Sequence, residues 1–234
     1  MRQAAYDEIA EWYEHTFLAG QRAQGGADTD PLGIRNALDV LLGEGSGPCL
    51  DIGCGTGIFA EQIRRLGWEP VGVDLSGRML RFAANRLPVA QADATALPIR
   101  DASVPVAVAI MVHTDMPDYA SVMAEVARVL RPGGSVVHIG VHPCFCGGFA
   151  DRSNPEAIII RPGYTNQHWT TTSWTNQGLR AKVGASHLPL PQLLRTFIEN
   201  DLTLANFIEG GTPTPTVLAL KAQKPLRTGL IPDL

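Results

Sequence analysis

A short apolar run in this sequence ends in three alternate glycines, because residues 49–57 read CLDIGCGTG. Glycines at alternate positions permit a sharp turn at positive φ and leave no Cβ between the backbone N–H groups and a ligand. Asp51 stands where the apolar run stops, so its carboxylate can neutralise a cationic group held beside the glycines. A dinucleotide site would instead show G-x-G-x-x-G, with a helix N-terminus aimed at a pyrophosphate. The segment therefore predicts a strand, a turn and a helix that bind a ligand other than a phosphate.

The chain after this turn alternates strand-like and helix-like segments. Alternation of this kind predicts an α/β fold, with a parallel sheet covered by helices on both faces and a short antiparallel hairpin at the C-terminal end. The expected strands are 49–52, 70–74, 89–92, 104–112, 135–141, 202–208 and 216–222, and the expected helices are 6–18, 32–42, 58–66, one beginning at Ser76, 119–130 and 192–200.

Composition limits the class of protein. A chain of 234 residues, 45% of them hydrophobic, suits a single domain with a buried core. Its net charge of −4 with scattered Lys and Arg argues against a nucleic-acid partner. We find neither an 18-residue apolar run nor the apolar core of a signal peptide, and four cysteines do not suggest a secreted disulfide framework. The expectation is a cytoplasmic protein without a membrane partner.

Further motifs follow the glycine turn in a fixed order. Asp74 and Asp93 end the second and third expected strands, and residues 130–134 read LRPGG. Together these motifs resemble the class I S-adenosylmethionine-dependent methyltransferases, in the small single-domain branch (methyltransferase type 11) related to the quinone pathways. The resemblance covers roughly residues 6–125 and 128–140. It implies a Rossmann-like, doubly wound, mostly parallel seven-stranded sheet that binds S-adenosyl-L-methionine and methylates O, N or C of a small molecule such as a secondary metabolite.

The resemblance also divides the chain into four parts. Residues 1–47 form an N-terminal helical cap and residues 48–141 the cofactor-binding core. Residues 142–188, which show the least regular pattern, form an aromatic-rich cover over the substrate, since long irregular segments in compact domains are usually functional. Residues 189–234 supply the last helix and the hairpin. A monomer or a homodimer is expected.

The acids at the strand ends carry the cofactor prediction. The carboxylate of Asp74 can accept hydrogen bonds from both hydroxyls of a ribose, although it could instead cap the next helix. Asp93 resembles the acid that meets the exocyclic amine of adenine, and could also be a solvated turn residue. The full expected cofactor set is Tyr13, Asp51, Gly53, Cys54, Gly55, Gly57, Asp74, Leu75, Met79, Asp93, Ala94 and Met111.

A general base would help if the acceptor is a hydroxyl, a phenol or a protonated amine, and histidine is matched to neutral pH. The candidates are His113, His142 and His187, each of which could also be structural. His113 is favoured because it lies at the end of a parallel strand, where ligands of open α/β sheets bind. The expected substrate contacts are Asp115, Phe145, His168 and Trp169; Asp115 could also orient His113 or cap a helix.

Three other interpretations remain open or are set aside. His138, His142, Cys144 and Cys146 suggest a metal site, but two histidines four residues apart on a strand would lie about 13 Å from each other, so no metal is expected. A nicotinamide-dependent oxidoreductase is disfavoured by the acid in front of the glycines. A protein that keeps the cofactor site for binding, regulation or a non-methylating reaction is not excluded, because fold does not determine the chemistry of the acceptor pocket.

Overall fold

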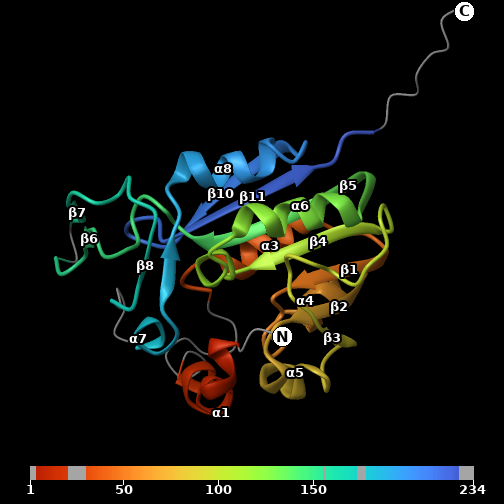
Figure 1. The fold of residues 1–234 in the computed structure, drawn as a ribbon, viewed down its shortest axis with the longest axis horizontal. Helices are drawn as coiled ribbons and strands as arrows, with labels where there is room; N and C mark the ends of the chain where they lie inside the picture. The colour runs from red at the N-terminus through yellow and green to blue at the C-terminus, as the bar shows by residue number, and fades with distance from the viewer. Residues whose placement is uncertain (1–3, 21–29, 155–156, 173–177, 227–234) are drawn as a thin grey trace, which may run out of the picture.

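The computed structural model describes residues 4–20, 30–154, 157–172 and 178–226. Its centre is a seven-stranded sheet with the order β10-β11-β5-β4-β1-β2-β3 (Figure 1). Strands β1 to β5 run parallel to one another, whereas β11 is antiparallel to both β5 and β10. This is the predicted sheet with its antiparallel hairpin. The strands are β1 (Gly47–Ile52), β2 (Trp68–Asp74), β3 (Val89–Gln91), β4 (Val104–Ile110), β5 (Leu130–Val141), β10 (Thr203–Gly210) and β11 (Val217–Gln223).

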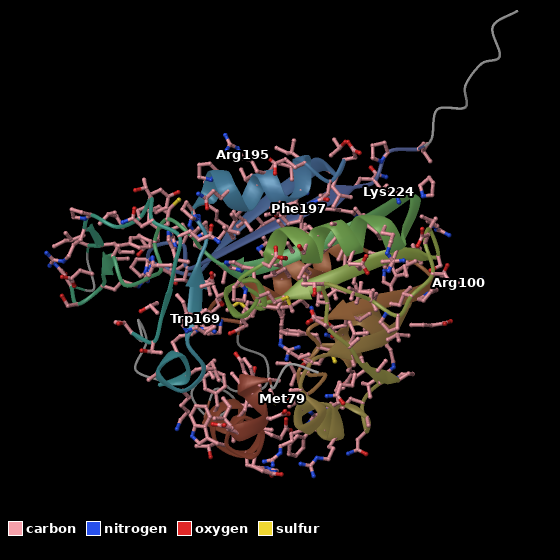
Figure 2. All side chains as sticks on the ribbon, viewed as in Figure 1. Met79, Arg100, Trp169, Arg195, Phe197 and Lys224 are labelled. Atoms are coloured by element: carbon pink, nitrogen blue, oxygen red, sulfur yellow. The ribbon has the colours of Figure 1, made fainter. Side chains whose placement is uncertain are left out.

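Helices cover both faces of the sheet. On one face, α3 (Ile34–Leu42) and α4 (Ala60–Arg65) pack against alternate side chains of the central strands, including Cys49 and Val108. On the other face, α6 (Tyr119–Val129) and α8 (Leu190–Ile198) bury Leu50 and Phe197, and Phe197 is labelled in Figure 2. Because β4 is buried on both faces, its sequence is almost wholly apolar. The short α5 (Gly77–Ala83) follows β2.

Two of the boundaries that differ from the prediction involve residues singled out in the sequence. Strand β4 ends at Ile110 instead of residue 112, because Met111 adopts a φ of 59° and the chain then enters the 3-10 turn η3 (His113–Asp115). Strand β5 begins at Leu130, so the LRPGG segment lies inside the strand and not before it. The first change matters for function, since it places His113 in a turn and not directly at the end of the strand.

The predicted N-terminal helix forms as three short turns of different pitch. These are the 3-10 turn η1 (Ala5–Glu8), the α-helical α1 (Ala10–Trp12) and the π-helical η2 (Tyr13–Phe17). They lie beside α5, to which Asp7 is bonded through the Ser76 hydroxyl at 2.7 Å. Residues 21–29, between this segment and α3, lie outside the described residues.

The cover segment carries more regular structure than its sequence suggests. It contains the antiparallel pairs β6 (Ala150–Asp151) with β7 (Ile159–Ile160), and β8 (His168–Thr170) with β9 (Ala185–His187), together with α7 (Leu179–Val183). Figure 1 shows β8 and α7 on the same side of the sheet as α1. None of the helices in the described ranges has the length and apolar character needed to cross a bilayer.

Candidate active site

The glycine turn connects β1 to α4, and its three glycines are needed for different reasons. Gly53, Gly55 and Gly57 all have positive φ, of 64°, 54° and 76°. A Cβ on Gly53 would lie 2.7 Å from Val112, and one on Gly57 would lie 2.5 Å from Leu87. A Cβ on Gly55 would meet only the Met79 methyl, at 3.7 Å. Packing therefore requires Gly53 and Gly57, while Gly55 leaves its backbone open to a ligand.

Asp51, at the C-terminal end of β1, is a buried carboxylate that lacks a full set of hydrogen bonds. Asp51 is 2% exposed, and its Oδ2 has no hydrogen-bond partner among the described residues. Burial, and then the charge of Asp74, raise the pKa of Asp51 to about 7. Since a buried acceptor without a partner is costly, this oxygen is suited to a cationic donor.

Asp74, at the end of β2, ties the glycine turn to α5. Its Oδ2 accepts from the Gly55 N–H and its Oδ1 from the Ser76 N–H, both at 2.8 Å. Burial raises the pKa of Asp74, and these two hydrogen bonds oppose the rise. The Ser76 hydroxyl caps α5 by accepting from Met79, as predicted, so Asp74 is not needed for that purpose. A carboxylate offers about four acceptor positions, which leaves room for ligand hydroxyls.

The remaining expected cofactor residues differ in how far their side chains are exposed. Asp93 is exposed after β3, and its Oδ1 accepts from the Thr95 N–H and hydroxyl. The Cys54 side chain packs in a buried cluster against β2, so only its backbone faces the turn. Met79 is buried with its methyl beside Gly55. Three further expected residues are partly buried, namely Leu75, Ala94 and Met111.

An unexpected cluster joins the cap, the loop after β4 and the cover. Asp115 forms an ion pair with the guanidinium of Arg180 from α7, which is 6% exposed, and also accepts a hydrogen bond from the Tyr6 hydroxyl. Burial and the charge of Asp115 raise the pKa of Tyr13, which lies in the same cluster. Asp115 was expected to contact substrate; the structure instead engages its carboxylate within the protein. Neither Tyr6 nor Arg180 carries a local sequence signal for this contact, because the partners are far apart in the chain.

The cap is also tied to the glycine turn. Glu14 forms an ion pair with Arg86, and the same guanidinium donates to the Thr56 carbonyl at 2.6 Å. Together with the bond from Ser76 to Asp7, this contact places the cap over the C-terminal ends of β1 and β2. The cap is therefore positioned to close the ligand site.

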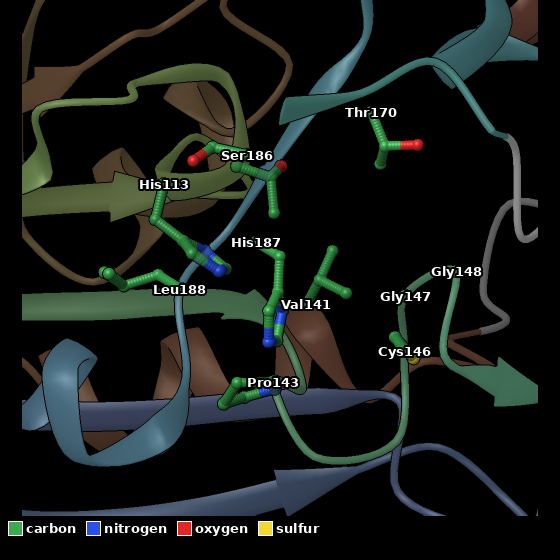
Figure 3. Close-up of a pocket in the computed structure, with 11 residues that line it drawn as sticks. His113, Val141, Pro143, Cys146, Gly147, Gly148, Thr170, Ser186, His187 and Leu188 are labelled. Atoms are coloured by element: carbon green, nitrogen blue, oxygen red, sulfur yellow. The ribbon is translucent and has the colours of Figure 1, made fainter. Parts of the chain in front are cut away.

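A small cavity lies beside His113, between the end of β5 and the cover (Figure 3). His113 and Thr114 come from η3, Val141 from the end of β5, and Ser186 and His187 from β9. Its volume of about 10 Å³ holds roughly one water molecule. No charged side chain lines it among the described residues. An acceptor can therefore enter only if the cover shifts, and the lining favours an uncharged molecule.

The three candidate bases differ in how their nitrogens are used. In His142, Nδ1 accepts from the Cys144 N–H at 3.1 Å and Nε2 lies 2.8 Å from the Glu209 carboxylate, so neither nitrogen is left for an acceptor. His113 and His187 both line the cavity. Burial lowers the pKa of each, and the effect is larger for His113, which also faces Arg180. Both imidazoles are therefore neutral near pH 7.

The other expected substrate residues lie at the edge of the cavity. The Phe145 ring packs on His142 with centroids 4.7 Å apart. His168 and Trp169 border an open surface groove next to Ser186, and Trp169 is 50% exposed. No group of three His, Cys, Asp or Glu side chains in the described part of the chain is arranged to hold a metal ion.

A family sequence model described as a methyltransferase domain matches residues 50–138, the part that carries the glycine turn and the strand-end acids. Residues 50–138 are a class I methyltransferase domain. Its family uses S-adenosyl-L-methionine as the cofactor. Neither the oxidoreductase nor the non-methylating interpretation gains support from the comparisons.

Relatives of the methyltransferase domain include two named O-methyltransferases. Malonyl-[acyl-carrier protein] O-methyltransferase of Serratia marcescens is 32% identical over 126 residues, which cover 51% of this chain and 49% of that protein. A ubiquinone biosynthesis O-methyltransferase of Cupriavidus pinatubonensis is 30% identical over 138 residues, covering 56% and 55%. The chain thus spans about half the length of the curated relatives it matches. An S-adenosylmethionine-dependent methyltransferase structure from Mesorhizobium loti shares the fold, with a TM-score of 0.68, 23% identity, and coverage of 80% of this chain and 96% of that chain.

The site residues of the methyltransferase domain fit this cofactor. The ammonium group of its methionine part would satisfy the unpartnered oxygen of Asp51, and its ribose hydroxyls would satisfy the remaining acceptor positions of Asp74. The space over Gly55, which a Cβ would enter, is available for it.

Replacing Asp74 tests this fit. Asp74→Ala is expected to weaken the binding of S-adenosylhomocysteine by roughly 2–3 kcal/mol, because the ribose loses a charged acceptor. Calorimetry on the folded variant measures the loss, with Asp101→Ala as the control, since Asp101 is an exposed acid that pairs with Arg128 and has no place in the glycine turn or the cap. Equal affinity in wild type and Asp74→Ala would show that the ribose is held elsewhere.

Proposed function

We propose that this chain transfers a methyl group from S-adenosylmethionine to an oxygen atom of an uncharged small molecule held beside His113 and His187. The observation that carries the proposal is the buried Asp51 carboxylate, whose Oδ2 has no hydrogen-bond partner among the described residues, next to an open glycine backbone. When bound, the cofactor supplies an electrophilic methyl group on a positively charged sulfur. Oxygen as the methylated atom is supported by the two O-methyltransferase relatives.

The protein residues in this proposal bind, orient and exclude water. Asp51 and Asp74 hold the cofactor at the ends of β1 and β2, and the cap closes over it through Glu14 and Asp7. The cover holds the acceptor in a narrow cavity lined by uncharged side chains. Most of the rate enhancement then comes from bringing the two reactants together in a water-poor space.

The proposal is tested in two steps with the full chain. Calorimetry should show binding of S-adenosylhomocysteine, and S-adenosylmethionine labelled in its methyl group should then pass the label to a member of a panel of phenols, alcohols and carboxylic acids. Label on an uncharged hydroxyl compound is the expected result. Absence of cofactor binding would overturn the proposal, while binding without transfer to any compound would favour a non-methylating role. The monomeric or dimeric state, the absence of a nucleic-acid partner and the cytoplasmic location stay predictions.

A further inference from the structure

The two cavity histidines differ in which ring nitrogen the protein engages and which is left for the cavity, and this difference extends the proposed function, on which it rests. The Nε2 of His187 lies 2.6 Å from the backbone carbonyl oxygen of Tyr164. A carbonyl oxygen only accepts hydrogen bonds, so Nε2 must carry the hydrogen. In the neutral ring, Nδ1 of His187 is therefore left with a free lone pair. The hydrogen bond to Tyr164 would also stabilise the ring if Nδ1 took up a proton.

His113 has a different surrounding. Its Nδ1 is buried without a hydrogen-bond partner among the described residues, and so is Nε2 of His138 on β5. Both nitrogens face the space left by Gly140, because a Cβ there would lie 2.4 Å from His113 Nδ1 and 2.8 Å from His138 Nε2. The two ring centroids are 5.0 Å apart. Since an unpartnered buried polar atom is costly, a small rotation of either ring that brings these two nitrogens into a direct hydrogen bond is favoured.

Tyr119 decides the direction of that hydrogen bond. Its hydroxyl lies 2.7 Å from Nδ1 of His138, and within the described part of the chain this is its one hydrogen-bond partner. Burial raises the pKa of Tyr119, so the hydroxyl stays protonated. Because His138 is its one partner among the described residues, the hydroxyl donates a hydrogen bond to Nδ1 of His138. His138 must then carry its hydrogen on Nε2 and donate toward Nδ1 of His113. His113 in turn carries its own hydrogen on Nε2, the nitrogen left for the cavity, and Figure 3 shows its imidazole pointing there.

We propose that these two hydrogen-bond chains give the cavity histidines opposite roles toward an uncharged hydroxyl acceptor. His187 is the base and His113 is a hydrogen-bond donor, while Tyr119 and His138 are positioning residues. In the transfer, the acceptor's O–H bond would break as its proton goes to Nδ1 of His187. The freed electron pair on oxygen would form the new bond to the methyl carbon while the methyl–sulfur bond breaks, and the electron pair of that bond would stay on the sulfur, leaving a neutral thioether. His113 holds the acceptor in place by donating from Nε2.

The environment of His187 supports this assignment. The titratable side chains that face it are His113 from η3, His168 from β8 and Tyr164 from the cover, and its ring also packs on Phe149. No carboxylate contacts it in the described structure, so His187 is neutral near pH 7 and its imidazolium forms only when a proton is transferred.

Nitrogen NMR of the full-length protein, labelled with ¹⁵N-histidine, tests the proton positions without any acceptor. Both His113 and His187 should carry hydrogen on Nε2 and none on Nδ1, with signals assigned from the His113→Gln and His187→Gln variants. Tyr119→Phe should convert the single form of His113 into a mixture of both tautomers and leave His187 unchanged. Tyr164→Phe is the matched control, because it removes a hydroxyl but keeps the carbonyl that holds His187, and should alter neither ring. Hydrogen on Nδ1 of either cavity histidine in the wild type, or an unchanged His113 in Tyr119→Phe, would overturn the proposal.

Turnover with an acceptor found in the label-transfer screen provides the second test. His187→Gln should lower kcat by about 10²–10⁴-fold with a nearly unchanged KM, as expected for loss of a general base. His113→Gln, whose amide can still donate, should mainly raise KM and lower kcat less than His113→Ala does. If His113→Gln lowered kcat by the larger factor and His187→Gln mainly raised KM, His113 would be the base. If the protein does not bind S-adenosylhomocysteine, the proposed function fails, whereas the NMR result still decides the proton positions.

Discussion

Asp51→Asn is expected to stabilise the ligand-free protein above neutral pH while weakening its binding of S-adenosylhomocysteine. Burial and the charge of Asp74 raise the pKa of Asp51 to about 7, from an ordinary value of 3.8. The folded state therefore holds the proton more tightly than the unfolded state does. The stability that this proton provides is complete below the unfolded pKa and is lost as the pH rises through the folded pKa. With about 1.4 kcal/mol for each pKa unit, the loss amounts to about 4 kcal/mol above pH 7.

Urea unfolding of both proteins measures this effect. The asparagine variant has no carboxylate to ionise, so its advantage in free energy of unfolding should grow by about 2 kcal/mol between pH 5.5 and pH 8.5. Asp93→Asn is the control, because Asp93 lies just after strand β3 of the same sheet but is exposed. A difference between Asp51→Asn and wild type that stays constant over this range would mean that Asp51 is ionised throughout.

The affinity for the cofactor should also depend on the ionisation of Asp51, but it should rise with pH where the stability of the ligand-free protein falls. A cationic ligand beside Asp51 favours the ionised carboxylate, so binding to the wild type should release a proton below pH 7 and tighten as the pH rises through 7. Calorimetry in buffers of different ionisation enthalpy detects that proton. In Asp51→Asn, both the proton release and this pH dependence should disappear. Identical proton release in the two proteins would place the ammonium group away from Asp51.

The parts of the fold and site that depend on local pattern could be predicted from the sequence. The apolar runs that end in Asp51 and Asp74 predicted two strands with an acid at the C-terminal end of each, as the structure has them. Ser76 predicted the N-cap of the following helix, which the structure also contains. The boundary of β4 could not be predicted, because the positive φ of Met111 is imposed by the turn that follows and not by its side chain.

The contacts that determine the roles of individual residues could not be predicted in this way. Arg180 and Asp115 are 65 positions apart, and their ion pair exists only because α7 folds back over the loop after β4. The sequence likewise predicted that His113 lies near the end of a strand. It could not predict which ring nitrogen of His113 carries the hydrogen, because that depends on Tyr119, His138 and the space left by Gly140. Such contacts follow from tertiary packing, for which a single sequence offers no periodic signal.

Gly55→Val is expected to abolish binding of S-adenosylhomocysteine, with only a moderate loss of stability. Its φ of 54° resists a β-branched side chain, which costs roughly 1–2 kcal/mol. Within the protein, however, a Cβ at this position meets nothing closer than the Met79 methyl at 3.7 Å. The added side chain therefore projects into the space assigned to the cofactor instead of into the core, so the ligand is blocked while the fold persists.

Gly57→Ala provides the matched comparison on the same turn. Its φ is also positive, at 76°, but its Cβ would lie 2.5 Å from Leu87 inside the cluster that packs α4 and α5 against β2. We therefore expect Gly57→Ala to lose more stability than Gly55→Ala, whereas Gly55→Val should lose more affinity than either alanine variant. Thermal unfolding and calorimetry on the three proteins separate the two effects. If Gly55→Val binds S-adenosylhomocysteine as the wild type does, the open backbone at Gly55 is not the cofactor surface and the assignment of the turn fails.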